Sequence, residues 1–356
     1  MAKRKLPPKK GSVPAPGEFD AVVELIDSAR ARAVAAVNTS LIDLYWQIGE
    51  HLGRKIAARE WGKGTVEELA AHIQKRQPGV TGFSASNLWR MRQFYDTYSE
   101  LPKLATLSRE LSWSHNLAIL SRSKLNEERE FYLRMAAKER WNFRELKRQL
   151  DGALFERVAL SPAKLSIPLT EQHPDAASVF RDSYLIEFLQ LPAQHAEADL
   201  QRGLVAQLKE FLLELGRDFC FVGSQYPLQV GTKDFALDLL FFHRGLNALV
   251  AIEIKVTEFE PSHLGQLEFY LEALDRDVRK SHEKPSVGVL LCATKNAEVV
   301  EYALSRSMSP AVVSEYRTQL PDKQLLQAKL HEFYQLALPA PEQDPPPAKS
   351  PKRRKS

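Results

Sequence analysis

The stretch Leu249-Val-Ala-Ile-Glu-Ile-Lys-Val256 decides the fold, because it places two charged side chains inside an otherwise apolar run. A short run rich in branched aliphatic residues is typical of a buried strand. Side chains alternate between the two faces of a strand, so Glu253 and Lys255 share one face with Leu249 and Ala251. The opposite face is expected to carry Val250, Ile252, Ile254 and Val256.

A second apolar strand with one internal acid comes just before it. Phe235–Phe242 contains Asp238, and only the five residues His243–Asn247 separate the two strands. So short a link predicts an antiparallel hairpin, which can bring Asp238 beside Glu253.

Charges on a largely buried sheet are costly unless they are paired or bound to a metal. Two ionised carboxylates at Asp238 and Glu253 therefore call for a cation, and oxygen ligands favour Mg²⁺ or Mn²⁺. Lys255 would orient or deprotonate a water, or stabilise transition-state charge, in phosphodiester hydrolysis. The alternative is structural: Asp238 pairs with Lys255, and Glu253 lies at a frayed edge.

Further elements extend outward from this hairpin. Their order predicts an α/β or α+β domain, a mixed sheet flanked by helices, over residues 183–338. The expected helices are Asp199–Leu215, Ser262–Leu274, Asn296–Ser305 and Asp322–Leu336. The other expected strands are Phe219–Val222, Tyr226–Val230, Ser286–Ala293 and Val312–Tyr316.

The first half of the chain, residues 18–160, has helical periodicity throughout and predicts an all-helical domain. Residues 161–182 contain three prolines among polar residues and predict a linker. The ends, 1–17 and 339–356, are Pro-rich, carry ten basic and two acidic side chains, and predict disordered tails. The basic cluster at 349–355 is compatible with phosphate binding, an address signal or simple solubility.

The composition narrows the class of protein. With only Cys220 and Cys292, the chain is expected to form no cysteine-based zinc cluster and to work in a reducing compartment. No apolar run approaches the ~20 residues of a membrane span, and no signal peptide is evident, so we expect a cytoplasmic protein.

The ordered series of motifs resembles the PD-(D/E)XK nuclease superfamily, and more specifically its bacterial YhcG-like family. The resemblance covers roughly residues 20–336. It rests on Asp234–Phe242, Ala251-Ile-Glu-Ile-Lys255, Glu258–Pro261, Gly265–Tyr270 and Leu290–Cys292, and in the first half on Leu44–Gly49, Phe83–Tyr95 and Leu111–His115. It implies a restriction-endonuclease-like fold and metal-dependent DNA cleavage, with Asp238, Glu253 and Lys255 as the core triad and Gln266 as a further active-site residue.

Two positions depart from the family pattern. Gln201 stands where relatives tend to have an acid from the first helix, which leaves Glu210 and Glu214 as candidates; we assign Glu214 to the site. Thr257 occupies a position often filled by glycine, and a threonine there would narrow the substrate approach.

The helical domain contains a segment that resembles a helix-turn-helix: Thr65–Arg76, a turn at Pro78–Phe83, and Ser84–Tyr98. The second helix offers donors to phosphates and base edges. The predicted DNA contacts are Ser84, Ser86, Asn87, Arg90 and Arg92.

These observations predict a magnesium-dependent DNA endonuclease acting on duplex or branched DNA, in defence, recombination or repair, with a homodimer left open. An inactive nuclease fold that only binds DNA is the alternative, and RNA cleavage uses the same chemistry. A transcription regulator fails to explain the charged triad.

Overall fold

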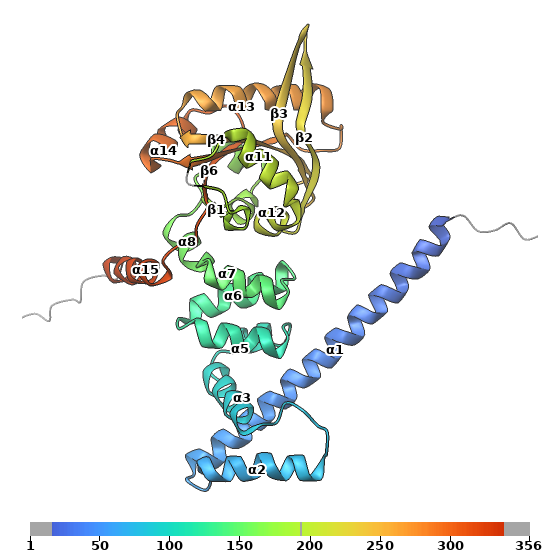
Figure 1. Ribbon diagram of the computed structural model, residues 1–356, viewed down its shortest axis with the longest axis vertical. Coiled ribbons are helices and arrows are strands. Elements are labelled where there is room, and N and C mark those ends of the chain that lie inside the picture. Colours follow the sequence, from blue (N-terminus) through green and yellow to red (C-terminus); the bar gives the residue numbers. More distant parts are fainter. Residues whose placement is uncertain (1–15, 193, 338–356) are drawn as a thin grey trace, which may run out of the picture. The chain divides into compact units, whose positions relative to one another are not determined.

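The computed structural model describes residues 16–192 and 194–337 (Figure 1). The chain divides into two compact units, residues 1–147 and 148–356, which are described separately below. The predicted tails lie outside the described residues, except that the first helix begins at Pro16. Within the described ranges, none of the helices has the length and apolar character needed to cross a membrane.

The first unit consists of helices, as its periodicity predicts. The helices are α1 (Pro16–Ala57), α2 (Lys63–Arg76), α3 (Ala85–Tyr98), α4 (Pro102–Ser108), α5 (Trp113–Arg122), α6 (Asn126–Lys138) and α7 (Phe143–Asp151), which crosses the boundary. The backbones of α1 and α3 approach closely at Gly49, where a Cβ atom would lie 2.2 Å from the Met91 carbonyl oxygen.

The helix α1 continues through Asn38-Thr39-Ser40, three residues that often end helices by bonding to nearby backbone. Here the Asn38 side-chain amide donates to the carbonyl of Leu111 (2.9 Å), and the Thr39 hydroxyl donates to that of Arg109 (3.4 Å). Because these two side chains bond to distant backbone, they do not compete with the helix's own hydrogen bonds.

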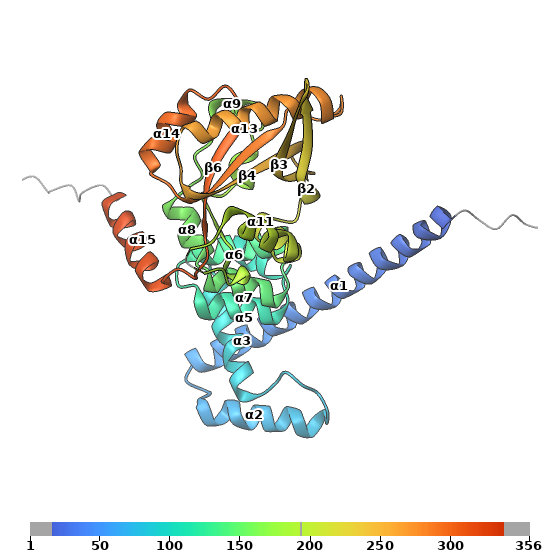
Figure 2. The same cartoon turned by 45° about the horizontal axis from the view of Figure 1, so that its top comes forward.

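The second unit is built on a six-stranded mixed sheet (Figure 2). Its strand order is β1-β6-β5-β4-β3-β2, in which β1, β6, β5 and β4 are parallel while β3 and β2 join antiparallel. The strands are β1 (Ser183–Leu185), β2 (Phe219–Val230), β3 (Lys233–His243), β4 (Ala248–Glu258), β5 (Val287–Thr294) and β6 (Ala311–Arg317).

Helices cover both faces of this sheet. One apolar core joins Val250, Ile252 and Ile254 of β4 to α11 (Glu197–Ala206) and α12 (Leu208–Leu215). The other joins Leu249 and Ala251 to α13 (Ser262–Ala273) and α14 (Ala297–Ser305), so the predicted alternation along β4 is confirmed for these five residues. The remaining elements are α8 (Leu154–Leu160), α9 (Ile167–Gln172), α10 (Ala176–Val179), a 3₁₀ turn at Glu187–Leu189, a π-helical turn at Leu274–Val278 and α15 (Lys323–Ala337).

Two predicted elements differ in detail. The helix expected over Asp199–Leu215 is interrupted at Gln207, which leaves helical geometry and donates its side-chain amide to the Phe188 carbonyl (3.0 Å). The two short strands expected within 219–230 form the single strand β2, in which an irregularity between Phe221 and Gly223 absorbs the break in alternation.

Residues 161–182, predicted as a linker, pack onto the sheet instead. The Ser166 backbone N–H donates to the Ala311 carbonyl (3.0 Å), and the Ser166 hydroxyl accepts from the Ala311 N–H (2.9 Å) while donating to the Ser309 carbonyl (2.8 Å). Leu169 and Phe180 are buried in the sheet's core. The prolines here stop regular structure without excluding burial, and we call residues 161–182 the edge segment.

Candidate active site

The site begins at the point where β3 and β4 separate. The two strands pair antiparallel from His243↔Ala248 to Leu239↔Ile252, as the short link predicts. Continuing that register by one residue sets Asp238 opposite Glu253. The structure therefore brings these two acids together.

Asp238 is held by hydrogen bonds from three directions. Its Oδ2 accepts from the Ile254 backbone N–H (2.9 Å), at the level where the pairing of β3 with β4 has ended. Its Oδ1 accepts from the side-chain amide of Gln225 (3.2 Å), and the amide of Gln201 lies 3.4 Å away. The carboxylate thus closes the gap between the strands in a fixed orientation.

Glu253 is 2% exposed, and Lys255 is the one hydrogen-bond partner of its carboxylate among the described residues. The Lys255 ammonium donates to its Oε1 at 2.9 Å, whereas its Oε2 is buried without a hydrogen-bond partner. Such an oxygen is costly unless another group satisfies it. Lys255 also reaches Glu197, with 3.6 Å between Nζ and Oε1.

The electrostatics of the three groups are strongly coupled. Burial, and next the charge of Asp238, raise the pKa of Glu253 to about 7. Burial and the charge of Glu197 also raise the pKa of Asp238, against the hydrogen bond from Ile254. Burial would lower the pKa of Lys255, but the bond to Glu253 and the surrounding acids raise it on balance, so Lys255 stays an ammonium.

Helix α11 supplies two residues that the sequence reasoning did not place in the site. Glu197 is its first residue and lies beside Lys255, and Gln201 follows four residues later on the same face. The Gln201 amide donates to the Asp238 carbonyl oxygen (3.0 Å). The signal in the sequence is an acid one helical turn before Gln201, but Glu197 precedes the helix predicted from Asp199 and so lies outside its periodic pattern.

Glu214, which was assigned to the site, lies elsewhere in the second unit. Its carboxylate is fully buried and is surrounded by Arg148 (2.9 Å), Arg181 (3.3 Å) and Arg157 (3.7 Å). It also accepts from the Leu185 N–H at 2.9 Å. Burial would raise the pKa of Glu214, but the three arginines lower it on balance. Its position on the inward face of α12 gives it a structural role.

Gln266 lies on α13, one turn from the start of the helix, as expected. Its side-chain amide donates to the Tyr270 hydroxyl (2.9 Å), and the residue is exposed. Among the contacts of residues 194–337, none joins Gln266 to the two acids or to Lys255. Its part in the site stays a prediction. Glu210, the other helix candidate, is half-buried in the first turn of α12.

The five predicted DNA contacts of the first unit separate into two groups. Three have internal partners: Ser84 caps α3 by accepting from the Asn87 N–H, Asn87 accepts from the Trp113 indole (3.0 Å), and Arg92 pairs with Asp96 (3.1 Å). Ser86 and Arg90 are exposed. Engagement of the first three favours a role in holding α3 in place.

Arg90 lines a groove of about 470 Å³ within the first unit. Arg122 of α5 and Lys147 of α7 line it too, together with Gln93 and Ser121, and no acidic side chain contributes to its wall. We call this the basic groove. Cations with amide and hydroxyl donors form the kind of surface that phosphates bind.

The acids of the site suit a divalent cation. Within the described ranges, no three His, Cys, Asp or Glu side chains gather into a ready-made metal cluster. Two carboxylates do converge, and one of their oxygens, Glu253 Oε2, is buried without a partner. A hard cation with carboxylate and water ligands would satisfy that oxygen and offset the repulsion between the two acids. The residues present therefore fit Mg²⁺ or Mn²⁺.

Comparison with known proteins assigns both halves of the chain. The sequence pattern of the DUF1016 N-terminal domain matches residues 21–157, and that of the YhcG PDDEXK nuclease domain matches residues 177–331. The chain is 33% identical over 351 residues to "Putative nuclease YhcG" of Escherichia coli (strain K12), covering 87% of this chain and 92% of that protein.

A solved structure, described as the crystal structure of a repair endonuclease from Pyrococcus abyssi, is 14% identical with a TM-score of 0.24. The match covers 36% of this chain and 49% of that one, and at this level it carries no argument. The identity to the Escherichia coli protein extends through both units, and the Asp238–Glu253–Lys255 arrangement lies inside the matched nuclease domain. The chain therefore belongs to the YhcG family of PDDEXK nucleases.

Proposed function

We propose that this protein is a metal-dependent DNA endonuclease whose phosphodiester hydrolysis takes place at Asp238, Glu253 and Lys255. The observation that carries the proposal is the buried, unsatisfied Glu253 Oε2 beside a second carboxylate and an ammonium. Buried ions that are kept at a cost in stability concentrate at functional sites. Burial and the neighbouring charge of Asp238 raise the pKa of Glu253 to about 7, which supports a site where two acids are held close together and a cation would relieve their repulsion.

Asp238 and Glu253 would hold the cation. A bound divalent ion polarises the phosphoryl group and acidifies a water molecule. Asp238 suits this part because the bonds from Ile254 and Gln225 hold its carboxylate in one orientation before the ion arrives. Gln201, anchored to the Asp238 backbone, holds α11 against the same strand.

Lys255 supplies positive charge next to the acids. Because its pKa is raised, it is an ammonium at neutral pH and stabilises negative charge that develops on the phosphate, instead of removing a proton. Glu197 is a second ion-pair partner of that ammonium, with 3.6 Å between Nζ and Oε1, and so helps to hold it in place. We assign Glu197 as a positioning residue.

We infer that the first unit captures DNA through the basic groove. Arg90, Arg122 and Lys147 line one concave surface without an acid among the lining residues, which favours contacts to the phosphate backbone. Of the predicted DNA contacts, this proposal retains Arg90. It sets aside Arg92, which is paired with Asp96, in favour of Arg122 and Lys147.

The test is a cleavage assay with Mg²⁺ or Mn²⁺ on linear duplex, branched and single-stranded DNA, and on duplex RNA. Lys255→Ala should lower cleavage at least a hundredfold, the scale of removing one transition-state charge donor. Lys329→Ala is the matched control, because Lys329 is an exposed lysine on α15. Both variants should unfold at the wild-type temperature within a few degrees.

The outcomes separate the candidate functions. DNA cleavage that survives Lys255→Ala refutes the assigned site, and a preference for RNA refutes the substrate. Tight DNA binding without any cleavage in either metal favours the inactive nuclease fold. In that case Glu197 and Gln201 would be read as structural partners of β3 and β4.

A further inference from the structure

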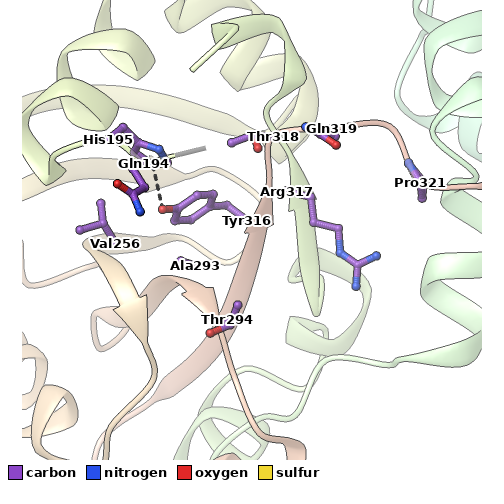
Figure 3. A pocket seen from close by; sticks show the side chains of 10 residues that line it. All are labelled: Gln194, His195, Val256, Ala293, Thr294, Tyr316, Arg317, Thr318, Gln319 and Pro321. Atoms are coloured by element: carbon purple, nitrogen blue, oxygen red, sulfur yellow. Dashed lines mark hydrogen bonds between the residues drawn. The ribbon is translucent and has the colours of Figure 1, made fainter. Parts of the chain in front are cut away.

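A cavity of about 540 Å³ lies in the second unit, at the carboxyl ends of the parallel strands β4, β5 and β6 (Figure 3). Ligands of open α/β sheets bind characteristically at this end of the strands. Its volume falls within the roughly 300–1,000 Å³ of small-molecule sites. The lining residues are Gln194, His195, Val256, Ala293, Thr294, Tyr316, Arg317, Thr318, Gln319 and Pro321. We call this the strand-end cavity.

The cavity lies just beyond Lys255 in the direction of the carboxyl ends of the strands. In the register of the sheet, Lys255 of β4 lies beside Cys292 of β5, which lies beside Glu315 of β6. One residue further along the same three strands lie Val256, Ala293 and Tyr316, which form the cavity's inner wall. A strand advances by about 3.3 Å per residue and its side chains alternate, so this wall begins one step beyond Lys255 but on the face of the sheet that α11 and α12 cover, opposite to the face of Lys255.

The loop before α11 connects the cavity to the site a second time. Gln194 and His195 line the cavity, and Glu197, two residues later, lies 3.6 Å from the Lys255 ammonium. Both ring nitrogens of His195 are engaged, one with the Tyr316 hydroxyl (2.9 Å) and one with the Pro192 carbonyl (3.0 Å). The dashed bond in Figure 3 shows how this pair fixes the loop against β6.

The chemistry of the wall selects the ligand class. Among the described residues that line the cavity there is no Asp, Glu or Cys, and His195 is already hydrogen-bonded through both ring nitrogens, so these residues do not form a metal site. Arg317 is the one Arg or Lys in that described lining, whereas a polyphosphate would need several. The polar lining consists mainly of two amides and two hydroxyls, Gln194, Gln319, Thr294 and Thr318, each able to donate and accept.

Amides and hydroxyls beside an apolar, partly aromatic wall match the edge and face of a nucleobase. Unpaired bases are read by hydrogen bonds to their exposed edges and by contact with apolar or aromatic side chains. Arg317 lines the cavity with a side chain that is 40% exposed; its Nε lies 3.3 Å from Glu315, and its other guanidinium donors can meet the phosphate of the same nucleotide. A base inside a duplex cannot enter such a cavity.

We propose that the strand-end cavity binds the base of an unpaired nucleotide next to the scissile phosphodiester. The substrate class of the site would then be DNA with an unpaired or extruded nucleotide, such as a bulge, a branch point or a single-strand junction. This inference rests on the proposed nuclease function. Its binding component is independent of the metal and of cleavage.

The test uses two duplexes that differ only in one central unpaired nucleotide, in which 2-aminopurine reports the environment of the extruded base. Binding is measured in EDTA, and cleavage is measured separately with Mg²⁺. Gln194→Ala and Gln319→Ala remove exposed lining side chains that the fold does not need. Gln172→Ala, an exposed glutamine on α9, is the matched control.

The full-length wild-type protein should bind the bulged duplex at least tenfold more tightly than the paired one. Each cavity variant should weaken bulge binding about threefold to tenfold, the effect of one lost hydrogen bond, and leave paired-duplex binding unchanged. Gln172→Ala should change neither. Equal losses on both duplexes, or no loss on either, would overturn the inference.

Failure of this proposal and failure of the nuclease proposal give different results. Bulge-selective binding that depends on the cavity but is followed by no cleavage in any metal leaves the cavity assignment standing and refutes the nuclease function. Cleavage that is equally fast on both duplexes and is unaffected by the cavity variants refutes the cavity assignment and leaves the nuclease function standing.

Discussion

Replacing Glu214 by alanine should destabilise the second unit severely, although Glu214 lies away from the candidate active site. Its carboxylate is fully buried and compensates Arg148, Arg157 and Arg181, which are themselves 19%, 3% and 10% exposed at the side chain. Arg148 retains Glu187 as a second partner at 2.8 Å. Removal of one partner from a buried ion cluster costs about 3–5 kcal/mol. A loss of this size is a large fraction of a domain's whole stability, which is about 5–15 kcal/mol.

Urea unfolding of the full chain measures this loss. With a typical dependence of about 2–3 kcal/mol per molar urea, the midpoint should fall by roughly 1–2.5 M. All five tryptophans lie within residues 1–147, so tryptophan fluorescence reports the first unit while far-UV circular dichroism also reports the second. Glu210→Ala, on the same helix, is the matched control and should change the free energy of unfolding by less than about 0.5 kcal/mol.

A Glu214→Gln variant separates charge from hydrogen bonding, because its amide oxygen can still accept from the Leu185 N–H. It should lose about 1.5–3 kcal/mol, the scale of hydrogen bonds to charged groups. The pKa of Glu214 is lowered on folding, so its stabilisation is present above the unfolded pKa and disappears as the pH falls through the folded pKa. The wild type and this variant should therefore converge in strong acid. A loss below about 1 kcal/mol for Glu214→Ala at neutral pH would refute the buried-cluster reasoning.

Three further outcomes are expected. Metal-free protein should lose on the order of 3 kcal/mol as the pH rises from about 4.5 through about 7, because the pKa of Glu253 is raised on folding. In calorimetric scans Glu253→Gln should remove most of this dependence and leave the smaller part that comes from the raised pKa of Asp238. In fluorescence-anisotropy titrations, Arg90→Ala should reduce the slope of log affinity for DNA against log salt concentration by roughly one unit. Arg92→Ala should leave that slope unchanged, because Arg92 is paired with Asp96. Equal slopes for the two variants would exclude the basic groove as the contact surface. Gly49→Ala should destabilise the first unit by about 1–3 kcal/mol in tryptophan-detected unfolding, since its Cβ would clash with the backbone of α3, and an unchanged midpoint would contradict the close approach.

The sequence predicted the parts of the site that depend on local geometry. Asp238 and Glu253 meet because the short link 244–247 leaves β3 and β4 no other pairing than an antiparallel hairpin. Lys255 follows two residues after Glu253, and the period of a strand settles which residues share its face. The same local reasoning located the sheet's helices to within a few residues at α13, α14 and α15.

The parts of the site that depend on packing between segments distant in the chain cannot be predicted from local sequence patterns. Glu197 reaches Lys255 because α11 docks against β4, and spacing along the chain carries no record of that contact. Glu214 is buried because three arginines, from α7, α8 and the edge segment, surround its carboxylate. Each of them is more than 30 residues away along the chain, so local sequence patterns do not indicate the contact. On α3, a serine at the helix start is a typical N-cap, which is the part that Ser84 plays, whereas only the structure shows that Asn87 has an internal partner and that Ser86 is exposed.

The edge segment has a practical consequence for taking this protein apart. Residues 161–182 lie against the start of β6, where Ser166 and Leu165 pair with Ala311 and Val312. A nuclease fragment cut at residue 177, where the family's catalytic domain pattern begins, would lose that cover and leave strand-end backbone groups open. Exposed strand edges recruit other chains, so such a fragment should aggregate on expression. Chimeras that exchange helical regions between relatives should therefore join at or before Lys147, the last residue of the first compact unit.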